Sequence, residues 1–269
     1  MFRRSRRCGS GLAPVVEAVV VMGLAVLSAC PGPEEPVAGE TRTFADIEFQ
    51  WCPAGTFTMG SPEDEAGHRD DETQHDVTLS RGFWLGKCEV TQAQWGNVMG
   101  SNPSHFNIDA RNPVDSVSWD DAQEFVAALN ADNPGMTFRL PTESEWEYAC
   151  RAGTETQYYF GEDPTVAELG DNVWHNGNSD GETHPVGGKA ANAWGLHDMN
   201  GNVSEWCWDR YGDYPAEAVT DPTGPAAGDS RVTRGGWICI LSSYRAAFRL
   251  GAPPDGGGRC VGLRLARDP

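Results

Sequence analysis

Glycine and proline are so frequent in this chain that long regular elements are excluded over most of its length. Its 269 residues include 32 Gly and 18 Pro, and both residue types interrupt helices and strands and mark turns. After Gly153 no helix-start pattern follows, although ten Trp and ten Phe are available to build a core. The sequence therefore predicts an α+β fold with few regular elements and long ordered loops, in one large domain.

Three helices are predicted by their N-terminal capping patterns. In each, a Ser or Thr precedes an acid or amide by three residues, so that the two side chains satisfy the first free N–H groups of a helix. The three pairs are Thr91–Gln94, Ser118–Asp121 and Thr142–Glu145. The first helix is expected to run to about Met99 and the third to stop at Gly153. Short strands are predicted at Gly55–Met59, Asp76–Leu79, Phe83–Val90 and Arg231–Trp237.

Two acidic clusters have structural explanations in the sequence. The run at residues 62–76 is predicted to form a solvated hairpin loop. Glu143, Glu145 and Glu147 crowd the start of the third helix, where capping and the helix dipole favour negative charge. Acid–base chemistry by these three carboxylates requires a pair that faces a cleft.

The N-terminus has the pattern of a secretory signal that ends in a lipid-attachment cysteine. A head with four arginines precedes an apolar stretch at residues 18–29, which is too short to span a bilayer. Leu27-Ser28-Ala29-Cys30 resembles the lipobox of bacterial lipoproteins, in which the cysteine thiol takes the lipid. We therefore predict a signal peptide at residues 1–29 and lipidation of Cys30. The protein is then expected in the bacterial cell envelope, anchored to the lipid bilayer and facing the periplasm or the exterior.

The mature chain is predicted to consist of a tether and a single domain. Residues 30–44 are rich in Pro and Glu and lack apolar periodicity, which is typical of a flexible tether. The domain then occupies residues 45–269. A formal net charge of −19 repels phosphate, so nucleic acid is excluded as a partner.

Six cysteines remain after Cys8 leaves with the signal peptide and Cys30 takes the lipid. An even number in an oxidising compartment favours disulfides, but six cysteines permit fifteen pairings and the sequence does not select one. The six are Cys52, Cys88, Cys150, Cys207, Cys239 and Cys260.

Seven segments together resemble the formylglycine-generating enzyme, or sulfatase-modifying factor, family. They occur in the family's order and spacing and cover roughly residues 47–267. They are Trp51–Gly60, Glu89–Trp95, Pro113–Ala122, Arg139–Ala149, Trp194–Trp206 and Arg234–Trp237, followed by the closing pair Arg245–Arg249 and Gly262–Arg264, which is counted as one. The resemblance implies a fold related to C-type lectin-like domains.

The same resemblance implies an oxidase chemistry for which this chain lacks one residue. Family members convert a sulfatase cysteine to formylglycine with copper and molecular oxygen, and two thiolates five residues apart hold the Cu(I). Cys239 stands for the first thiolate, but Tyr244 occupies the place of the second. Copper is therefore expected only if another thiolate, from Cys207 or Cys260, pairs with Cys239. A disulfide is the alternative for such a pair.

The resemblance also implies calcium. The loop at residues 198–206 matches the family's calcium loop, and the implied ligands are the Asp198 and Glu205 side chains with the Gly201 and Val203 carbonyls. An ion-free polar turn is the alternative for this loop. A second calcium site is implied at Asn172 and the Val173 carbonyl, completed near residues 178–180.

Two functions remain open from the sequence. The first is a calcium-braced binding or structural module whose loops recognise a protein or a glycan, because the scaffold pattern is intact while a thiolate is missing. The second is a formylglycine-generating oxidase centred on Cys239.

Overall fold

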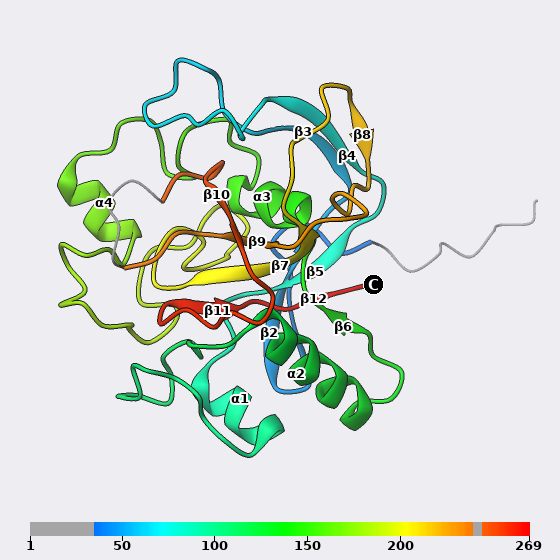
Figure 1. Ribbon diagram of the computed structural model, residues 1–269, viewed down its shortest axis with the longest axis vertical. Coiled ribbons are helices and arrows are strands. Elements are labelled where there is room, and N and C mark those ends of the chain that lie inside the picture. The colour runs from blue at the N-terminus through cyan, green and yellow to red at the C-terminus, as the bar shows by residue number, and fades with distance from the viewer. Residues whose placement is uncertain (1–34, 239–243) are drawn as a thin grey trace, which may run out of the picture. The chain divides into compact units, whose positions relative to one another are not determined.

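Three small sheets and four helices form the fold of the computed structural model, which describes residues 35–238 and 244–269 (Figure 1). The first sheet has the order β1 (Thr41–Phe44), β2 (Ile47–Cys52), β5 (Phe83–Gly86), β12 (Ala266–Arg267) and β6 (Phe138–Arg139). The second has the order β10 (Arg249–Ala252), β9 (Arg231–Arg234), β7 (Ser204–Arg210) and β11 (Val261–Leu263). The third contains β3 (Gly55–Met59), β4 (His75–Leu79) and β8 (Val219–Thr220). All neighbours are antiparallel except the parallel pairs β11–β7 and β4–β8. The predicted α+β class is confirmed.

The three predicted helices form with the predicted caps. They are α1 (Gln92–Met99), α2 (Trp119–Asp132) and α3 (Glu143–Arg151), and each begins with a reciprocal capping box. The third helix ends at Arg151, and its C-cap residue Ala152, in the left-handed conformation, directly precedes Gly153. Across the described ranges, no helix combines the length and the apolar character that a bilayer crossing requires.

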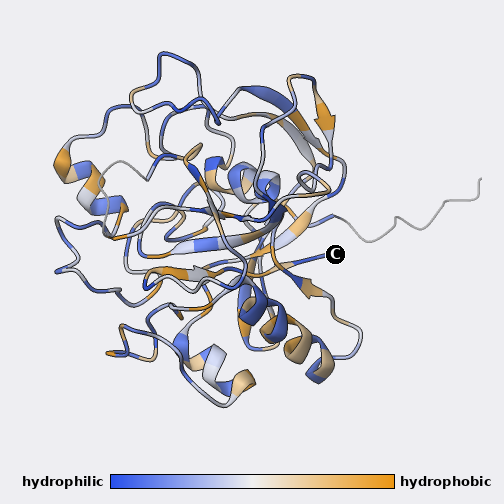
Figure 2. Ribbon diagram, viewed as in Figure 1, coloured by the Kyte–Doolittle hydropathy of each residue, from blue (hydrophilic) through white to orange (hydrophobic). Residues whose placement is uncertain are grey.

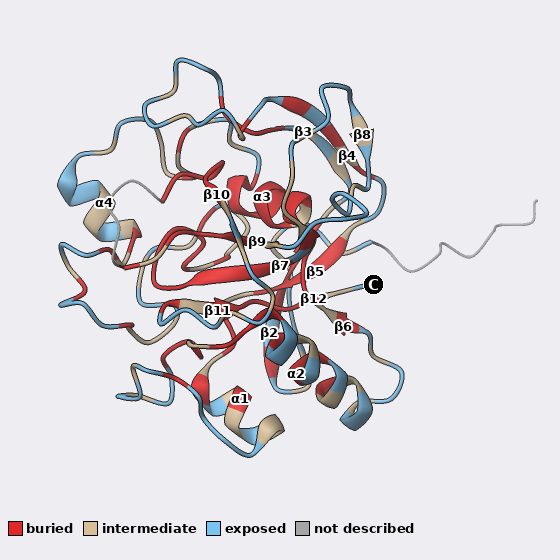
Figure 3. Ribbon diagram, viewed as in Figure 1, coloured by how far each residue is buried: buried red, intermediate tan, exposed pale blue. Residues whose placement is uncertain are grey.

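The prediction that no helix follows Gly153 is wrong. A fourth helix, α4 (Val166–Asn172), has a capping box between Thr165 and Glu168. None of its residues is buried, and Figure 3 shows it largely exposed, whereas α3 and β7 are buried. Thr165 and Glu168 have the same spacing as the capping pairs of the other three helices, so this start signal is present in the sequence, but α4 buries no apolar face and no periodicity supports it.

The expected strand boundaries also need correction. The strand predicted at Phe83–Val90 ends at Gly86, and the one predicted at Arg231–Trp237 ends at Arg234. The second ends there because Gly235 and Gly236 follow with φ angles of +92° and +70°, which leave the extended region. At the other end of the domain, β1 lies within the segment predicted as tether and pairs with β2, so Thr41–Phe44 belong to the folded domain.

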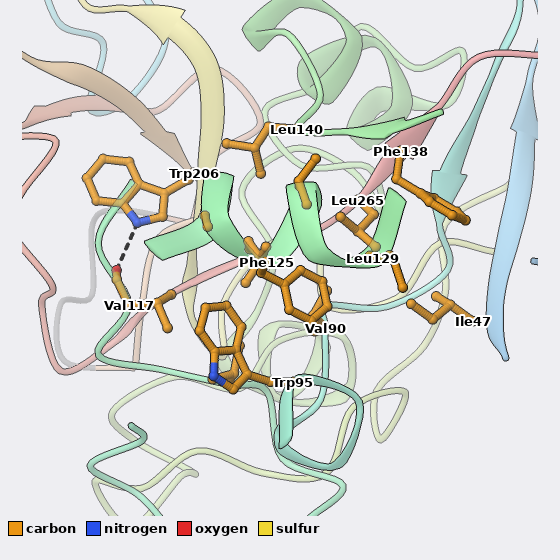
Figure 4. Packing of buried hydrophobic residues seen from close by; sticks show 14 of the residues in the cluster. Ile47, Val90, Trp95, Val117, Phe125, Leu129, Phe138, Leu140, Trp206 and Leu265 are labelled. Carbon is orange, nitrogen blue, oxygen red and sulfur yellow. Dashed lines mark hydrogen bonds between the residues drawn. The ribbon is translucent and has the colours of Figure 1, made fainter. Parts of the chain in front are cut away.

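The main apolar core lies between α2 and the first sheet. Trp95 of α1 stacks on Phe125 of α2 with the ring centroids 5.0 Å apart, and both are buried. Figure 4 shows Trp206 of β7 reaching into the same cluster, where its indole nitrogen donates to the Val117 carbonyl at 2.9 Å. A second cluster lies around α3 and includes Trp146 together with Cys52, Cys150 and Cys207.

Four arginines of the family-like segments are almost fully buried and pair with buried glutamates. Arg234 pairs with Glu147, Arg245 with Glu65 and Glu72, Arg249 with Glu143, and Arg264 with Glu205. Buried charges need such partners because desolvation of an isolated charge is costly. These pairs tie the strands at residues 231–264 to α3, β7 and the hairpin loop.

The hairpin loop between β3 and β4 is only partly solvated. It is hydrophilic along most of its length (Figure 2) and connects antiparallel strands in which Met59 faces His75, as expected for a hairpin. However, Glu72 is fully buried and Glu65 nearly so, because both accept hydrogen bonds from Arg245 at 2.7 Å. The loop is therefore held against the domain by a charged pair.

Candidate functional site

The Gly-Gly turn after β9 lies against the predicted calcium loop. The Gly201 N–H donates to the Gly235 carbonyl at 2.6 Å, and the Ser204 hydroxyl donates to the Gly236 carbonyl at 3.1 Å. Cys239, the expected first thiolate, lies outside the described residues. The turn that precedes it is thus fixed by the loop at residues 198–204.

Tyr244, which stands in place of the second thiolate, is fully buried. Its hydroxyl donates to the Trp237 carbonyl at 2.9 Å, and its ring centroid lies 6.2 Å from that of His175. A phenol engaged in this way offers no soft ligand to Cu(I).

Four of the six cysteines expected to form disulfides carry free thiols in the structure. They are Cys52, Cys88, Cys150 and Cys207. Cys52, Cys150 and Cys207 pack in the second apolar cluster, where a thiol behaves as a small hydrophobic group. The expectation of disulfides among these four is therefore corrected.

Burial also keeps these thiols protonated. It raises the pKa of Cys150 to about 12 and the pKa of Cys207 well above its usual value. Thiolates are the form that binds Cu(I), so Cys207 is a poor second ligand. The Cys260 carbonyl accepts from the N–H of Ser204 at 2.8 Å, and the Ser204 hydroxyl contacts Gly236 of the turn.

The implied calcium ligands are only partly available for a cation. Both Glu205 oxygens accept from Arg264, the shortest bond being 2.7 Å, and Oε2 also accepts from the Trp146 indole at 2.7 Å. Asp198 differs, because Oδ2 accepts from the Gly187 N–H at 2.6 Å while the buried Oδ1 has no hydrogen-bond partner. The Asp198 side chain therefore fits a cation, and the Glu205 side chain does not.

Hydrogen bonds engage both residues of the second implied calcium site. The Asn172 side chain donates to the Glu168 carbonyl at 2.8 Å, and the Val173 carbonyl accepts from the Asn178 side chain at 2.9 Å. Asn178 does lie beside Val173, as expected, but its amide occupies the carbonyl. Calcium at this site stays a prediction.

Gly201 cannot accept a side chain without moving its neighbours. Its φ is +119°, and an added Cβ would lie 2.5 Å from the Trp174 carbonyl oxygen. We expect Gly201→Ala to lower the free energy of unfolding by about 2–3 kcal/mol, measured by urea denaturation. Gly96→Ala is the matched control, because that position lies in α1 with no atom within 4 Å and should raise stability by about 0.5–1 kcal/mol. Equal effects of the two substitutions would contradict this prediction.

A cavity of about 380 Å³ opens where β4, α3, β7 and β10 meet a loop at residues 212–225. Its apolar lining comes from Met59, Val219 and three prolines of the loop. His75 packs on Tyr214 with the ring centroids 4.8 Å apart and contributes a polar edge. The full lining also includes Glu143, Ser144, Asp209, Arg210, Asp213 and Arg249. An apolar cavity of this size with a few fixed polar groups is typical of a ligand site.

Asp209 is the most perturbed acid of this cavity. It is 3% exposed, and its Oδ2 accepts from the Glu143 N–H at 2.9 Å. Burial raises its pKa to about 8, and the negative charge of Glu143 adds to the rise. At neutral pH the carboxyl is therefore largely protonated and can donate a hydrogen bond to a ligand.

Arg249 fixes the floor of the cavity. Its guanidinium pairs with both Glu143 oxygens at 2.7 Å, donates to the Gly212 carbonyl at 2.8 Å, and lies 4.0 Å from the Tyr214 ring centroid. The Tyr214 hydroxyl in turn donates to Glu143 at 2.9 Å. These contacts hold the polar groups in place before any ligand arrives.

Sequence reasoning did not identify this cavity. Its walls come from five separate stretches of the chain, and Glu143 is the lining residue that the sequence analysis discussed as a candidate for acid–base chemistry. The one available signal was the stretch at residues 215–225 with its three prolines, which begins shortly after the end of β7.

Comparison with known proteins agrees with the fold and with the motif order. Residues 36–269 match the model of the sulfatase-modifying factor enzyme 1-like domain. The chain is 32% identical to the chaperone protein LppX of Paenibacillus barcinonensis, over 93% of this chain and 97% of that protein. It is 36% identical to the formylglycine-generating enzyme of Streptomyces coelicolor, over 69% of this chain and 61% of that enzyme.

Two solved structures share the fold over most of the chain. Treponema denticola variable protein 1 superposes with a TM-score of 0.77 at 31% identity, and the match covers 86% of this chain and 99% of that protein. PvdO from Pseudomonas aeruginosa gives a TM-score of 0.78 at 28% identity, and the match covers 87% of this chain and 100% of PvdO. The chain belongs to the sulfatase-modifying factor (formylglycine-generating enzyme-like) family.

Proposed function

We propose that this protein is a non-oxidising member of the family that binds a partly unfolded segment of an exported protein through the Asp209 cavity. In this proposal calcium braces the scaffold, and the lipid on Cys30 anchors the protein to a membrane of the cell envelope. Nucleic acid is not a partner, because the chain is strongly acidic.

One observation carries the proposal. The place of the second copper-binding thiolate holds the fully buried phenol of Tyr244, whose hydroxyl is committed to the Trp237 carbonyl. A copper centre needs two soft sulfur ligands, and Cys207 is buried as a protonated thiol. The scaffold is thus intact, while a buried phenol stands where the family pattern has its second thiolate.

The lining of the cavity favours a polypeptide over a glycan. Met59, Val219 and the loop prolines offer an apolar surface for side chains, and Asp209 offers a hydrogen bond to a peptide carbonyl. Stacking of a sugar needs an open aromatic face, but the Tyr214 ring is in contact with Arg249 and His75. LppX, which matches almost the whole chain, is named as a chaperone, and this supports a polypeptide client.

The test uses a permanently unfolded protein as probe. Labelled, reduced and carboxymethylated α-lactalbumin is titrated with this protein, and binding is followed by fluorescence anisotropy. We expect binding that Pro215→Arg, which inserts a charged chain at the cavity edge, weakens by roughly tenfold or more. Val166→Arg is the matched control, because Val166 is 82% exposed on α4 and does not line the cavity.

Three results would contradict the proposal. The probe could fail to bind, or both arginine variants could bind it equally well. Alternatively, the reduced protein loaded with copper could convert a Cys-x-Pro-x-Arg peptide to its aldehyde, as seen by mass spectrometry. That last result would establish the oxidase function instead.

A further inference from the structure

A second cavity, of about 420 Å³, lies where the ends of β4, β5 and β6 meet α3 and β7. It shares Pro222 and Thr223 with the Asp209 cavity, and the rest of its lining is different. Part of the lining is apolar and comes from the buried side chains of Leu79, Phe83 and Leu140. A cavity of this volume has the dimensions of a small-ligand site, and we refer to it as the Trp208 cavity.

Trp208 gives this cavity an open aromatic ring. The residue is 42% exposed, whereas its neighbours in β7, Cys207 and Asp209, are buried. Two side chains support the ring, because the Arg231 guanidinium lies 5.5 Å and the Trp119 ring centroid 5.6 Å from the Trp208 ring centroid. The Trp208 indole N–H forms no hydrogen bond within the described ranges. An exposed, supported tryptophan is a flat apolar platform with one free donor at its edge.

The polar groups around this platform include unused donors and an unused acceptor. Arg81 and Thr223 are both exposed, and neither side chain forms a hydrogen bond to another residue that the structure describes. Asp268 accepts from Arg139 through Oδ1, at 3.0 Å and 2.9 Å, and its Oδ2 has no donor in the same part of the chain. A ligand that both donates and accepts hydrogen bonds at several points fits this set.

The remaining polar side chains of the cavity are held in place and nearly balance in charge. Arg139 donates to the two Glu145 oxygens at 2.6 Å and 2.7 Å. The Ser80 N–H and hydroxyl donate to the Asp221 carboxylate at 2.8 Å and 2.5 Å. Two arginines and three carboxylates line the cavity in all, so neither sign dominates, although the chain carries a net charge of −19. These side chains favour a neutral ligand, and their fixed geometry lowers the cost of binding one.

We propose that the Trp208 cavity binds a neutral sugar ring of a glycan. The C–H face of a sugar is apolar and packs on a tryptophan ring, while each sugar hydroxyl can both donate and accept. Arg81 and the Trp208 indole can donate to these hydroxyls, and Asp268 Oδ2 can accept from one. A strongly charged ligand lacks a matching excess of charge in the lining.

This site is separate from the polypeptide site of the proposed function. The Tyr214 ring of the Asp209 cavity is covered by Arg249 and His75, whereas Trp208 keeps an open surface. The two cavities share only an exposed turn as a wall, so the protein can hold a glycan and a polypeptide next to each other.

The experiment titrates two neutral trisaccharides, maltotriose and tri-N-acetylchitotriose, into the full chain by calorimetry. We expect saturable binding of at least one of them, which Trp208→Ala weakens by roughly tenfold or more. Trp208→Phe keeps an aromatic platform and should bind more tightly than Trp208→Ala. Arg81→Ala removes an exposed donor and should weaken binding by roughly threefold or more. Ile108→Ala is the matched control, because Ile108 is 59% exposed and does not line the cavity.

Thermal unfolding of each variant shows that the domain is folded before binding is compared. Failure of both sugars to bind the folded wild type would overturn the inference, as would undiminished binding by Trp208→Ala. If neither sugar bound and Trp208→Ala instead weakened binding of the unfolded α-lactalbumin probe, the cavity would be a polypeptide site and the inference would fall. The proposed function is tested separately, because Pro215 lines the Asp209 cavity and not this one.

Discussion

Replacing Arg234 with methionine is expected to lower the free energy of unfolding by about 3–5 kcal/mol. Arg234 is fully buried, contacts the equally buried Glu147, and donates to the Phe248 carbonyl at 2.6 Å. Methionine fills much of the volume but leaves Glu147 with less charge compensation in the interior. Urea denaturation followed by tryptophan fluorescence measures the loss.

Two further variants identify the cause of that loss. Arg111→Met removes an arginine of the exposed Arg111–Asp109 pair, where solvent screens the charges, and should leave the urea midpoint close to that of the wild type. Adding Glu147→Gln to Arg234→Met removes the buried negative charge that Arg234 no longer compensates. The free energy of unfolding of the double variant should therefore fall by less than the sum of the two single changes. Strict additivity would show that the two side chains do not interact as the structure indicates.

Asp209→Asn is expected to make the protein more stable than the wild type at alkaline pH and equally stable below about pH 4. Burial raises the pKa of Asp209 from 3.8 to about 8, so the folded state retains a proton that the unfolded state releases. The wild type therefore loses about 1.4 kcal/mol of stability per pH unit between these two values, up to about 6 kcal/mol in all. Asparagine cannot ionise, yet its oxygen can still accept from the Glu143 N–H. Urea denaturation at a series of pH values measures the difference.

Asp221→Asn provides a control of opposite sign. Hydrogen bonds from the Ser80 side chain and backbone lower the pKa of Asp221, so its contribution to stability is present at neutral pH and is lost as the pH falls. Asp221→Asn should therefore lower the free energy of unfolding at neutral pH and leave it unchanged in acid. If Asp209→Asn showed the same trend, Asp209 would be ionised in the folded protein at neutral pH.

The sequence predicted the helix starts and one strand whose patterns lie within a few neighbouring residues. Capping pairs such as Thr91–Gln94 placed three helix starts correctly, because the pattern acts within one turn. The strand at Gly55–Met59 was predicted with its observed ends. The two-residue strands β6, β8 and β12 were not predicted, because so short a strand is defined by its neighbours and carries no pattern of its own.

The charged interior could not be predicted from spacing along the chain. Glu143 and Glu147 were explained by capping and by the helix dipole, yet they bind Arg249 and Arg234, which lie 106 and 87 residues away. The same limit applies to Glu89, which was noted only as part of a motif. Both of its oxygens are buried without a hydrogen-bond partner among the described residues, and the charges of Asp198 and Arg264 act on it only in the fold.

The position of β12 has a consequence for the order in which the domain can assemble. This strand pairs with β5 on one side and β6 on the other, so it joins segments made early in synthesis. β11, just before it, lies parallel to β7 at the edge of the second sheet. Until residue 267 is available, two sheets lack a strand and the edges of β5, β6 and β7 stay open to pairing with other chains. Folding of this domain is therefore expected to finish only after residue 267 has been made and is free to pair, and the intermediate that lacks β11 and β12 is the form most exposed to aggregation.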